Sequence, residues 1–321
     1  MLASNEAGLA CVIVLFAVVF ELARGGFFSP FNLYALGRYI AVDMVIGFSM
    51  MVVLAVGGMN LAVGSIGVCA AMLGGWAMED LGLPVPLAVA LALAGGAGLG
   101  LVNGLAVVRS GVSSFIVTLG TMSVFFGIMI VLTGAESFNQ LPAGFVGFGK
   151  LRLLRWVPAM LVLAVGVGLV LIGVFRFTAL GREMLAVGAN PKAAELSGVR
   201  VRRAVVTAHV LSGLLAGLAG LLVTTRNGAV LASLAGQIGQ DWLLPAFLAP
   251  VLGGTLLSGG VVSVAGTMLG AVLVNMLSNG LRQLQVGDFW IELFLGLILL
   301  VAVMLDRLRS VYAARRKLVR A

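Results

Sequence analysis

Apolar residues along the chain fall into long runs separated by short polar or glycine-rich breaks. Most runs approach about 20 residues, the length that an α-helix needs to cross a hydrocarbon layer roughly 30 Å thick. The pattern predicts ten spans, at residues 8–24, 39–58, 61–78, 85–108, 112–133, 157–177, 204–225, 242–257, 260–281 and 289–306. We therefore expect an all-α polytopic membrane protein whose residues 1–321 form a single transmembrane domain.

Two pairs of runs are separated by only two residues each, Met59-Asn60 and Ser258-Gly259. These junctions predict tight turns or broken helices inside the membrane, which are tolerated only where protein or a water-filled cavity surrounds them. A glycine pair lies just before each junction, Gly57-Gly58 and Gly253-Gly254, and this hints at a duplicated half-structure.

Small residues recur at four-residue spacing inside three of the runs. This spacing lets two helix backbones approach closely, where lipid provides no hydrophobic force between helices. We expect three packing faces, formed by Gly96/Gly100/Gly104, Gly213/Gly217 and Gly266/Gly270.

The composition excludes an ordinary soluble protein, because 61% of the residues are apolar and only 10% are charged. The net charge of +8 comes from basic residues in short segments between apolar runs, a placement that suits membrane topology and not nucleic-acid binding. With Cys11 and Cys69 inside apolar runs and His209 as the only histidine, we expect no disulfide and no metal site. The first run lacks a basic leader and an obvious cleavage site, which favours a retained span over a cleaved signal.

Basic residues also predict the orientation of the spans, since Lys and Arg concentrate in short cytoplasmic loops. Segment 176–203 and the tail 306–321 each hold six of them, and four predicted spans separate the two. With Arg109 that side carries thirteen basic residues against seven on the other, although Lys150, Arg152 and Arg155 form an exception. We expect both termini and the loop 178–203 in the cytoplasm.

One short string imitates a nucleotide-binding loop. The segment from Gly144 to Leu151, GFVGFGKL, nearly fits the phosphate-binding pattern G-x-x-x-x-G-K-[ST]. Leu151 stands where a hydroxyl would hold magnesium, and no strand precedes the string. We expect no cofactor on this chain, so if ATP drives it, a partner subunit binds the nucleotide.

Uncharged polar side chains inside the spans are candidates for a solute pathway. Hydroxyls and amides facing a pathway could pass a polyhydroxylated solute without binding it tightly, but the same groups also make ordinary hydrogen bonds between helices. In the ninth span, Asn275 is followed at helical spacing by Ser278 or Asn279 and then by Arg282, so these polar residues would lie on one face of the helix. The candidates are Asn60, Ser65, Ser114, Phe115, Thr118, Thr121 and Asn275.

Ionisable residues are scarce in the predicted span interiors. Asp43, Asp288 and Glu292 lie near span ends, where snorkelling or interfacial pairing explains them. Gradient-driven transporters usually carry buried carboxylates or histidines, so this class is disfavoured.

The long loop 178–203 predicts a short surface helix. Asn190 can cap its start, Pro191 suits the first helical position and Gly198 suits its end. Such a helix could dock in a groove of a partner, with the small side chain of Ala194 entering the groove, or it could be a plain connector. The candidate docking residues are Gly188, Asn190, Pro191, Lys192, Ala193, Ala194, Glu195, Ser197 and Gly198.

Four ordered stretches resemble one family over nearly the whole chain. They are GGMNLAVGSIG from Gly57, GLVNGLAVVRSGVSSFIVTLGTMSVFFGI from Gly100, LGREMLAVGANPKAAELSGVRV from Leu180 and VLGGTLLSGG from Val251. The family is the branch of ATP-binding-cassette permeases that import ribose, xylose, arabinose and related sugars, with a type II-like architecture in the bacterial inner membrane.

The resemblance implies a translocation subunit that is not itself an enzyme. Its implied partners are two cytoplasmic ATPase subunits, a periplasmic sugar-binding protein and a second permease copy in a homo- or heterodimer. The segment GANPKAAELSG would be the coupling helix. The chain departs from the family pattern at Asn60, where Asp is usual, and at Pro245 and Val262-Ser263, where an acidic residue and then Gly-rich, basic sequence are usual.

Rival functions are a gradient-driven transporter, an importer of a non-sugar solute or an exporter of the same architecture, and an intramembrane enzyme. An adjacent gene for a cassette ATPase would separate the importer from the gradient-driven transporter. The intramembrane enzyme is disfavoured because paired intramembrane carboxylates and a histidine cluster are missing from the sequence.

The predicted topology can be tested with reporter fusions. A reporter active only in the periplasm should be silent after the C-terminal tail and active when inserted near Phe138, because the basic residues place these points on opposite sides. The reverse pattern would overturn the orientation.

Overall fold

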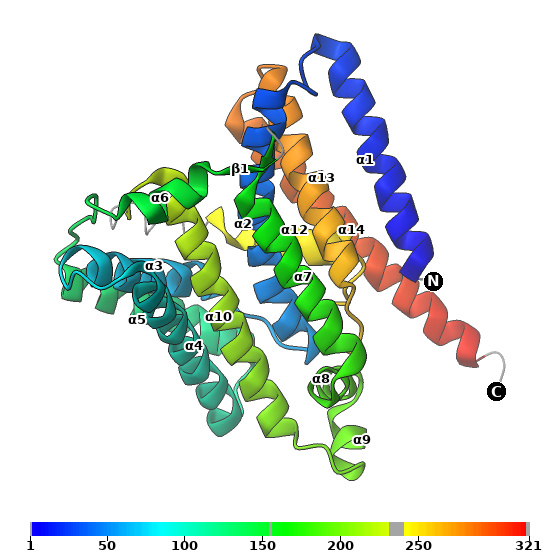
Figure 1. The fold of residues 1–321 in the computed structure, drawn as a ribbon. Coiled ribbons are helices and arrows are strands. Elements are labelled where there is room, and N and C mark those ends of the chain that lie inside the picture. Colours follow the sequence, from blue (N-terminus) through cyan, green and yellow to red (C-terminus); the bar gives the residue numbers. More distant parts are fainter. Residues whose placement is uncertain (1, 154–155, 231–240, 319–321) are drawn as a thin grey trace.

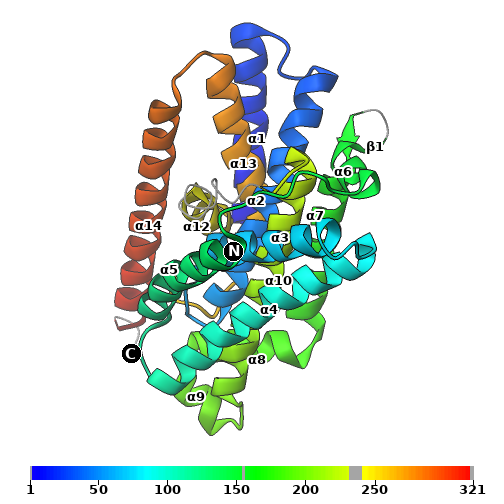
Figure 2. The same cartoon turned by 90° about the vertical axis from the view of Figure 1, so that its left-hand side faces the viewer.

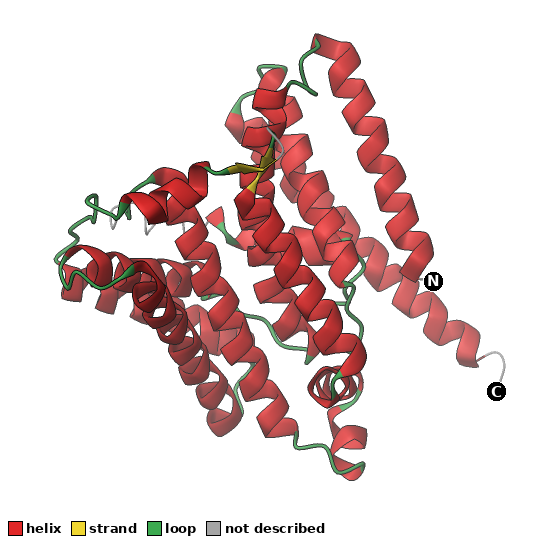
Figure 3. Ribbon diagram, viewed as in Figure 1, coloured by secondary structure: helices red, strands yellow, loops and turns green. Residues whose placement is uncertain are grey.

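The computed structural model describes residues 2–153, 156–230 and 241–318, and Figure 3 shows that nearly all of them are helical. The only strands in these ranges are β1 (Arg152–Leu153) and β2 (Val157–Pro158), which pair antiparallel. The helices are α1 (Leu2–Arg24), α2 (Pro30–Ala55), α3 (Val63–Glu79), α4 (Val85–Ser110), α5 (Ser114–Thr133), α6 (Ala143–Lys150), α7 (Ala159–Phe177), α8 (Ala179–Ala189), α9 (Pro191–Leu196), α10 (Val201–Asn227), α12 (Leu243–Leu252), α13 (Val264–Gln283) and α14 (Asp288–Leu318). The expected all-α polytopic fold is confirmed.

Helix α2 forms the centre of the bundle. Its start is fixed by Ser29, whose hydroxyl accepts a hydrogen bond from the Asn32 amide, and by Pro30 at the first helical position. Helix α2 is apolar on almost all sides and packs against α7, α10, α12 and α13 (Figure 1). A helix that is hydrophobic all round is buried, and α2 supplies much of the core.

Helices α1, α5, α7 and α14 present apolar side chains outward. About four fifths of the surface is exposed in each of three side chains: Leu22 in α1, and Val131 and Leu132 in α5. Helix α1 lies along the right-hand edge of the bundle in Figure 1, and α14 lies at the left-hand edge in Figure 2. Such outward faces are costly in water and natural against lipid or against another membrane subunit.

Seven helices among the described residues are long and apolar enough to cross a membrane: α1, α2, α4, α5, α7, α10 and α13. The other three predicted spans fall on α3, α12 and α14, so each of the ten predicted ranges contains a helix. The third predicted span is α3, of 17 residues, which runs nearly across the direction of α2 and α10 in Figures 1 and 2. The eighth is α12, whose 10 residues extend only about 15 Å.

A glycine-containing break lies beside each of these two shorter helices. Segment 56–62 separates α2 from α3, and segment 253–263 separates α12 from α13. The two predicted breaks are thus confirmed. The tenth predicted span lies within α14, and the side chains of the basic tail 306–321, like Arg155, lie outside the described residues.

The predicted small-residue faces are packing faces. On α4, a Cβ added at Gly96 would lie 2.6 Å from the Gly213 carbonyl oxygen of α10, and one at Gly100 would run into the His209 carbonyl oxygen. The third face behaves alike, because a Cβ at Gly270 in α13 would run into the carbonyl oxygen of Ala249 in α12. Backbone-to-backbone approach at these points holds α4 on α10 and α13 on α12.

A pair of substitutions on α4 tests this packing. Gly100→Ala should lower the free energy of unfolding in detergent by about 1–3 kcal/mol, because the new methyl group overpacks the α4–α10 contact. Gly98→Ala is the matched control, since nothing lies within 4 Å of its Cβ position. Equal thermal unfolding of the two variants would contradict the close approach.

Candidate functional site

The surface loop forms two short helices, α8 and α9, joined by a single residue. Thr178 caps α8 by accepting a hydrogen bond from the Gly181 amide at 3.2 Å. Asn190 ends α8 and also caps α9, because its side-chain oxygen accepts the Ala193 amide at 3.1 Å. Pro191 occupies the first position of α9, so the predicted helix start is confirmed.

The end of α9 also matches the prediction. Gly198 has a φ of 84°, in the left-handed region that favours glycine, and its amide bonds to the Glu195 carbonyl at 2.9 Å. The Ser197 hydroxyl donates to the Ala193 carbonyl at 2.9 Å. Helix α9 is therefore defined at both ends by its own residues.

The exposure of α9 corrects one expectation. Ala194 is only 5% exposed and packs into the main apolar core, so it does not face a partner. The side chain that projects is Leu196, at 91% exposure, with Lys192 and Glu195 also exposed. The sequence offered Leu196 only as one of three apolar residues of this helix, beside Ala193 and Ala194, because the rotation of a six-residue helix depends on how it packs against its neighbours.

The break between α2 and α3 is held by hydroxyl groups from α5. The Met59 amide donates to the Ser114 hydroxyl at 2.9 Å, and the Leu61 amide donates to the Thr118 hydroxyl at 3.0 Å. The Thr118 hydroxyl in turn donates to the Ser114 carbonyl at 2.7 Å. These side chains replace the helical partners that the unwound segment has lost.

Asn60 completes the break and is fully buried. Its side-chain oxygen accepts the Ala62 amide at 3.1 Å, and its side-chain nitrogen donates to the Ser212 hydroxyl of α10 at 2.9 Å. The hydroxyls of Ser212 and Ser49 lie 2.9 Å apart. Ser49 and Ser212 were missed from the sequence, although each is a polar residue within an apolar run.

The remaining candidate residues of this region differ in how far their side chains are exposed. Ser65 is buried and donates to the Ala62 carbonyl at 3.0 Å, and Thr121 donates to the Thr118 carbonyl at 3.3 Å. Phe115 is 48% exposed. The structure thus brings Asn60, Ser114 and Thr118 together around one break, with Phe115 beside them on α5.

Asn275 lies apart from this group. Its side-chain nitrogen donates to a carboxylate oxygen of Asp43 at 2.8 Å and to the Ala271 carbonyl at 3.0 Å. Helix α2 begins at Pro30, so Asp43 lies well inside this helix and the expectation that it lies near a span end is wrong. About 18 Å of helix separates Asp43 from the end of α2 at Ala55.

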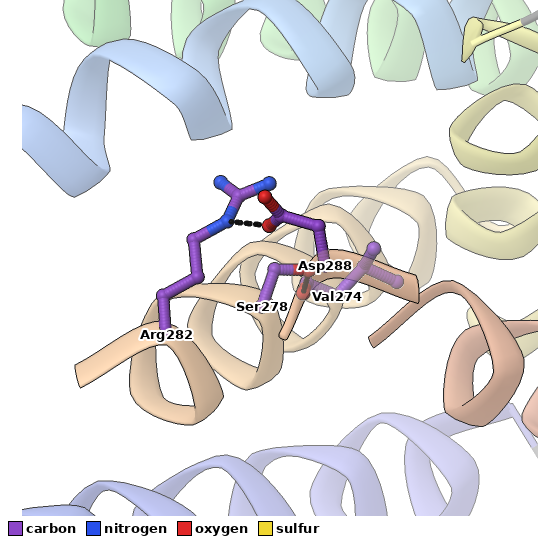
Figure 4. Close-up of polar contacts among 4 residues, drawn as sticks. All are labelled: Val274, Ser278, Arg282 and Asp288. Atoms are coloured by element: carbon purple, nitrogen blue, oxygen red, sulfur yellow. Dashed lines mark hydrogen bonds and ion pairs between the residues drawn. The ribbon is translucent and has the colours of Figure 1, made fainter. Parts of the chain in front are cut away.

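Of the polar residues that follow Asn275, Asn279 also bonds to α2, because its side-chain nitrogen donates to the Asn32 side-chain oxygen at 3.0 Å. Figure 4 shows the Arg282 guanidinium directed at the Asp288 carboxylate, with 2.9 Å between Nε and Oδ1. The Ser278 hydroxyl donates to the Val274 carbonyl of its own helix at 3.0 Å (Figure 4). Of the two explanations offered for Asp288, snorkelling and pairing, the structure shows a pairing, and an ion pair this exposed is worth at most about 1 kcal/mol.

The second break, between α12 and α13, has a similar set of supports. The Ser263 amide donates to the Thr255 hydroxyl at 3.2 Å. The Ser263 hydroxyl caps α13 by accepting the Gly266 amide at 2.8 Å, and it donates to the Glu6 carboxylate of α1 at 2.6 Å. Hydroxyl side chains therefore hold both helix breaks.

Two further points concern cofactors. The string GFVGFGKL lies mostly in α6, a helix, whereas a phosphate-binding loop needs an open turn of free amides. Within the part of the chain that the structure describes, no three His, Cys, Asp or Glu side chains lie close enough to hold a metal ion.

Comparisons with known proteins place these features in one family. Residues 31–304 match the family described as the branched-chain amino acid transport system permease component. The chain is 35% identical to the ribose import permease protein RbsC of Bacillus subtilis, covering 93% of this chain and 91% of that one. It is 33% identical to the fructose import permease protein FrcC of Rhizobium meliloti, covering 92% and 83%.

A further relative is the autoinducer 2 import system permease protein LsrD of Salmonella typhimurium, 30% identical over 89% of this chain and 88% of that one. No solved structure matches the chain significantly.

The support of the α2–α3 break can be tested by removing one hydroxyl. Thr118→Val should lower the free energy of unfolding by about 1–3 kcal/mol, because the buried Leu61 amide loses its acceptor. Thr121→Val is the matched control, since its hydroxyl bonds only within α5. If thermal unfolding in detergent does not separate the two variants, Thr118 does not hold the break.

Proposed function

The chain belongs to the family of permease components of branched-chain amino acid type transport systems, and on this premise we propose that it is the translocation subunit of an ATP-driven sugar importer. The observation that carries the proposal is its similarity, over almost its full length, to relatives named as import permeases for small hydroxylated solutes. The chain does not catalyse the hydrolysis that drives transport. A separate cytoplasmic ATPase subunit binds the ATP.

The proposed solute is a monosaccharide or a related polyol. Relatives are named for ribose and fructose, and the buried polar groups at the α2–α3 break are hydroxyls and an amide. The proposed pathway passes this break, where Phe115, next to Ser114 on α5, offers a half-exposed ring. Because another relative is named for autoinducer 2, a non-sugar solute is the alternative that a solute screen would test.

The proposed contact with the ATPase is the coupling helix α9. This helix is fixed at both ends by its own caps, and Leu196 projects from it into solvent between charged neighbours. An isolated, almost fully exposed leucine on a rigid helix suits insertion into an apolar groove. Lys192 and Glu195 would then lie at the rim, where charges affect specificity more than affinity.

The proposed assembly has two permease copies, two ATPase subunits and a periplasmic binding protein that delivers the solute. The exposed apolar faces of α1, α5, α7 and α14 leave room for both lipid and a second permease copy. The proposed orientation puts α9 and both chain ends in the cytoplasm of a bacterial inner membrane. The permease dimer can be of identical or of different chains.

One observation favours a second candidate, a gradient-driven transporter. Asp43 is a carboxylate inside a predicted span, and its partner is the uncharged amide of Asn275. Such groups often relay protons or bind ions in secondary transporters. The hydrogen bond also joins α2 to α13. The importer proposal assigns it this structural role alone.

Reconstitution separates the two candidates. Vesicles with this chain, its ATPase subunit and its binding protein should accumulate sugar only with ATP, because no nucleotide site lies in the described part of this chain. The chain alone should accumulate nothing. Gradient-driven accumulation by the chain alone that Asp43→Asn abolishes would support the second candidate instead.

The coupling contact can be tested at the exposed leucine. Leu196→Asp should reduce co-purification of the ATPase about tenfold or more, because a buried contact residue of an interface often contributes over 1 kcal/mol. Ala193→Ser, on the same exposed helix, is the control. Unfolding of the permease in detergent should stay within about 0.5 kcal/mol for both variants. Normal ATPase capture by Leu196→Asp would make α9 a plain connector.

A further inference from the structure

Three segments that are distant in the sequence meet at one point. They are the first helix break at 56–62, the second helix break at 253–263 and the C-terminal end of α8. A hydrogen bond joins the two breaks, because the Gly260 amide donates to the Ala55 carbonyl at 3.2 Å. The end of α8 lies against both, since a Cβ at Gly188 would run into the Ala55 carbonyl oxygen and the Gly260 amide nitrogen.

The meeting point is made mainly of backbone, with the small Ala189 side chain at its edge. A Cβ at Gly259 would lie 2.6 Å from the Gly57 amide nitrogen and 3.0 Å from the Cα of Gly188. A Cβ at Gly260 would lie 2.8 Å from the Cα of Ala189. Side chains at an interface can change rotamer and absorb a displacement, whereas backbones in direct contact pass it on.

Helix α8 connects this junction rigidly to α9. Met184 and Val187 are fully buried on α8, and Gly181 at its start packs against the backbone of α7. Asn190 alone separates α8 from α9 and caps the latter. A displacement of α9 must therefore move the end of α8, where Gly188 lies.

The two breaks are the places where the membrane helices can change direction. Their amides bond to carbonyls within short turns and to the hydroxyls of Ser114, Thr118 and Thr255, and not to a continuous helical ladder. Hinges of domain motions typically lie at such element ends, because a few residues there can absorb large changes in φ and ψ.

We propose that Gly188 is a positioning residue through which the surface helix α9 sets both helix breaks at once. The inference rests on the proposed importer function and adds a route for coupling. In this route ATP-driven movement at α9 reaches the α2–α3 and α12–α13 breaks together, through one backbone contact. The backbone conformation of the two breaks then changes simultaneously and not in sequence.

The first test uses the assembled complex of permease, ATPase and binding protein in vesicles. The Cβ position of Gly188 faces Ala55 and Gly260 at the two breaks, so Gly188 lies outside the docking surface proposed for α9. Gly188→Ala should therefore keep ATPase co-purification and basal ATP hydrolysis but reduce sugar uptake per ATP hydrolysed about tenfold, within the usual range of a coupling free energy. Gly173→Ala in α7 is the matched control, because nothing lies within 4 Å of its Cβ position. An unchanged ratio of uptake to hydrolysis in a folded Gly188→Ala complex would overturn the proposal.

The second test needs no substitution, so it decides the matter even if Gly188→Ala fails to fold. Amide hydrogen exchange of the wild-type complex is compared without nucleotide and with a non-hydrolysable ATP analogue. Exchange at 56–62 and 253–263 should shift together, by about fivefold or more. A shift confined to one break, or to α9 alone, would overturn the proposal. Failure of the importer function itself would appear differently, as a wild-type complex that hydrolyses ATP without taking up any sugar.

Discussion

The structure depends on one requirement, that backbone amides and carbonyls at membrane depth find partners within the protein. A continuous helix meets it by itself, but the described part of this chain has two breaks, at 56–62 and 253–263. Turn carbonyls accept many of the amides there, and side chains accept others: Ser114, Thr118 and Asn60 at the first break, and Thr255 and Ser263 at the second. The positions of α5 and of the start of α13 follow from these bonds.

The same requirement explains why glycine is so frequent. Forty-five of the 321 residues are glycine, and those at the contacts let one backbone reach another without a side chain between them. Gly100 against His209 joins α4 to α10 in this way, and Gly259 against Gly57 joins the two breaks. Close approach replaces the hydrophobic force that lipid does not provide between helices. The helices are therefore held together by close backbone packing, and even a small increase in side-chain volume at these contacts should destabilise the fold.

Function follows from where these contacts lie. The end of α8 is part of the contact between the breaks, and α9 with its exposed Leu196 is one residue further along the chain. In the proposed importer, the short helix α8 therefore connects the partner-binding helix α9 directly to both helix breaks. The side chains that bond at the first break, Asn60, Ser114 and Thr118, are all uncharged.

The sequence by itself determined the class of fold, the two breaks, the glycine packing faces and both ends of α9. These are local properties, because run length, glycine spacing and capping residues act over a few neighbours in the chain. Tertiary structure decided that α3 and α12 are too short to match the other spans, that Asp43 meets Asn275 inside the bundle, and that Ala194 points inward while Leu196 points outward. It also decided that Gly57, Gly188 and Gly259 meet. A helix's rotation and its distant neighbours depend on the packing of the whole bundle, and no periodicity within one segment contains that information.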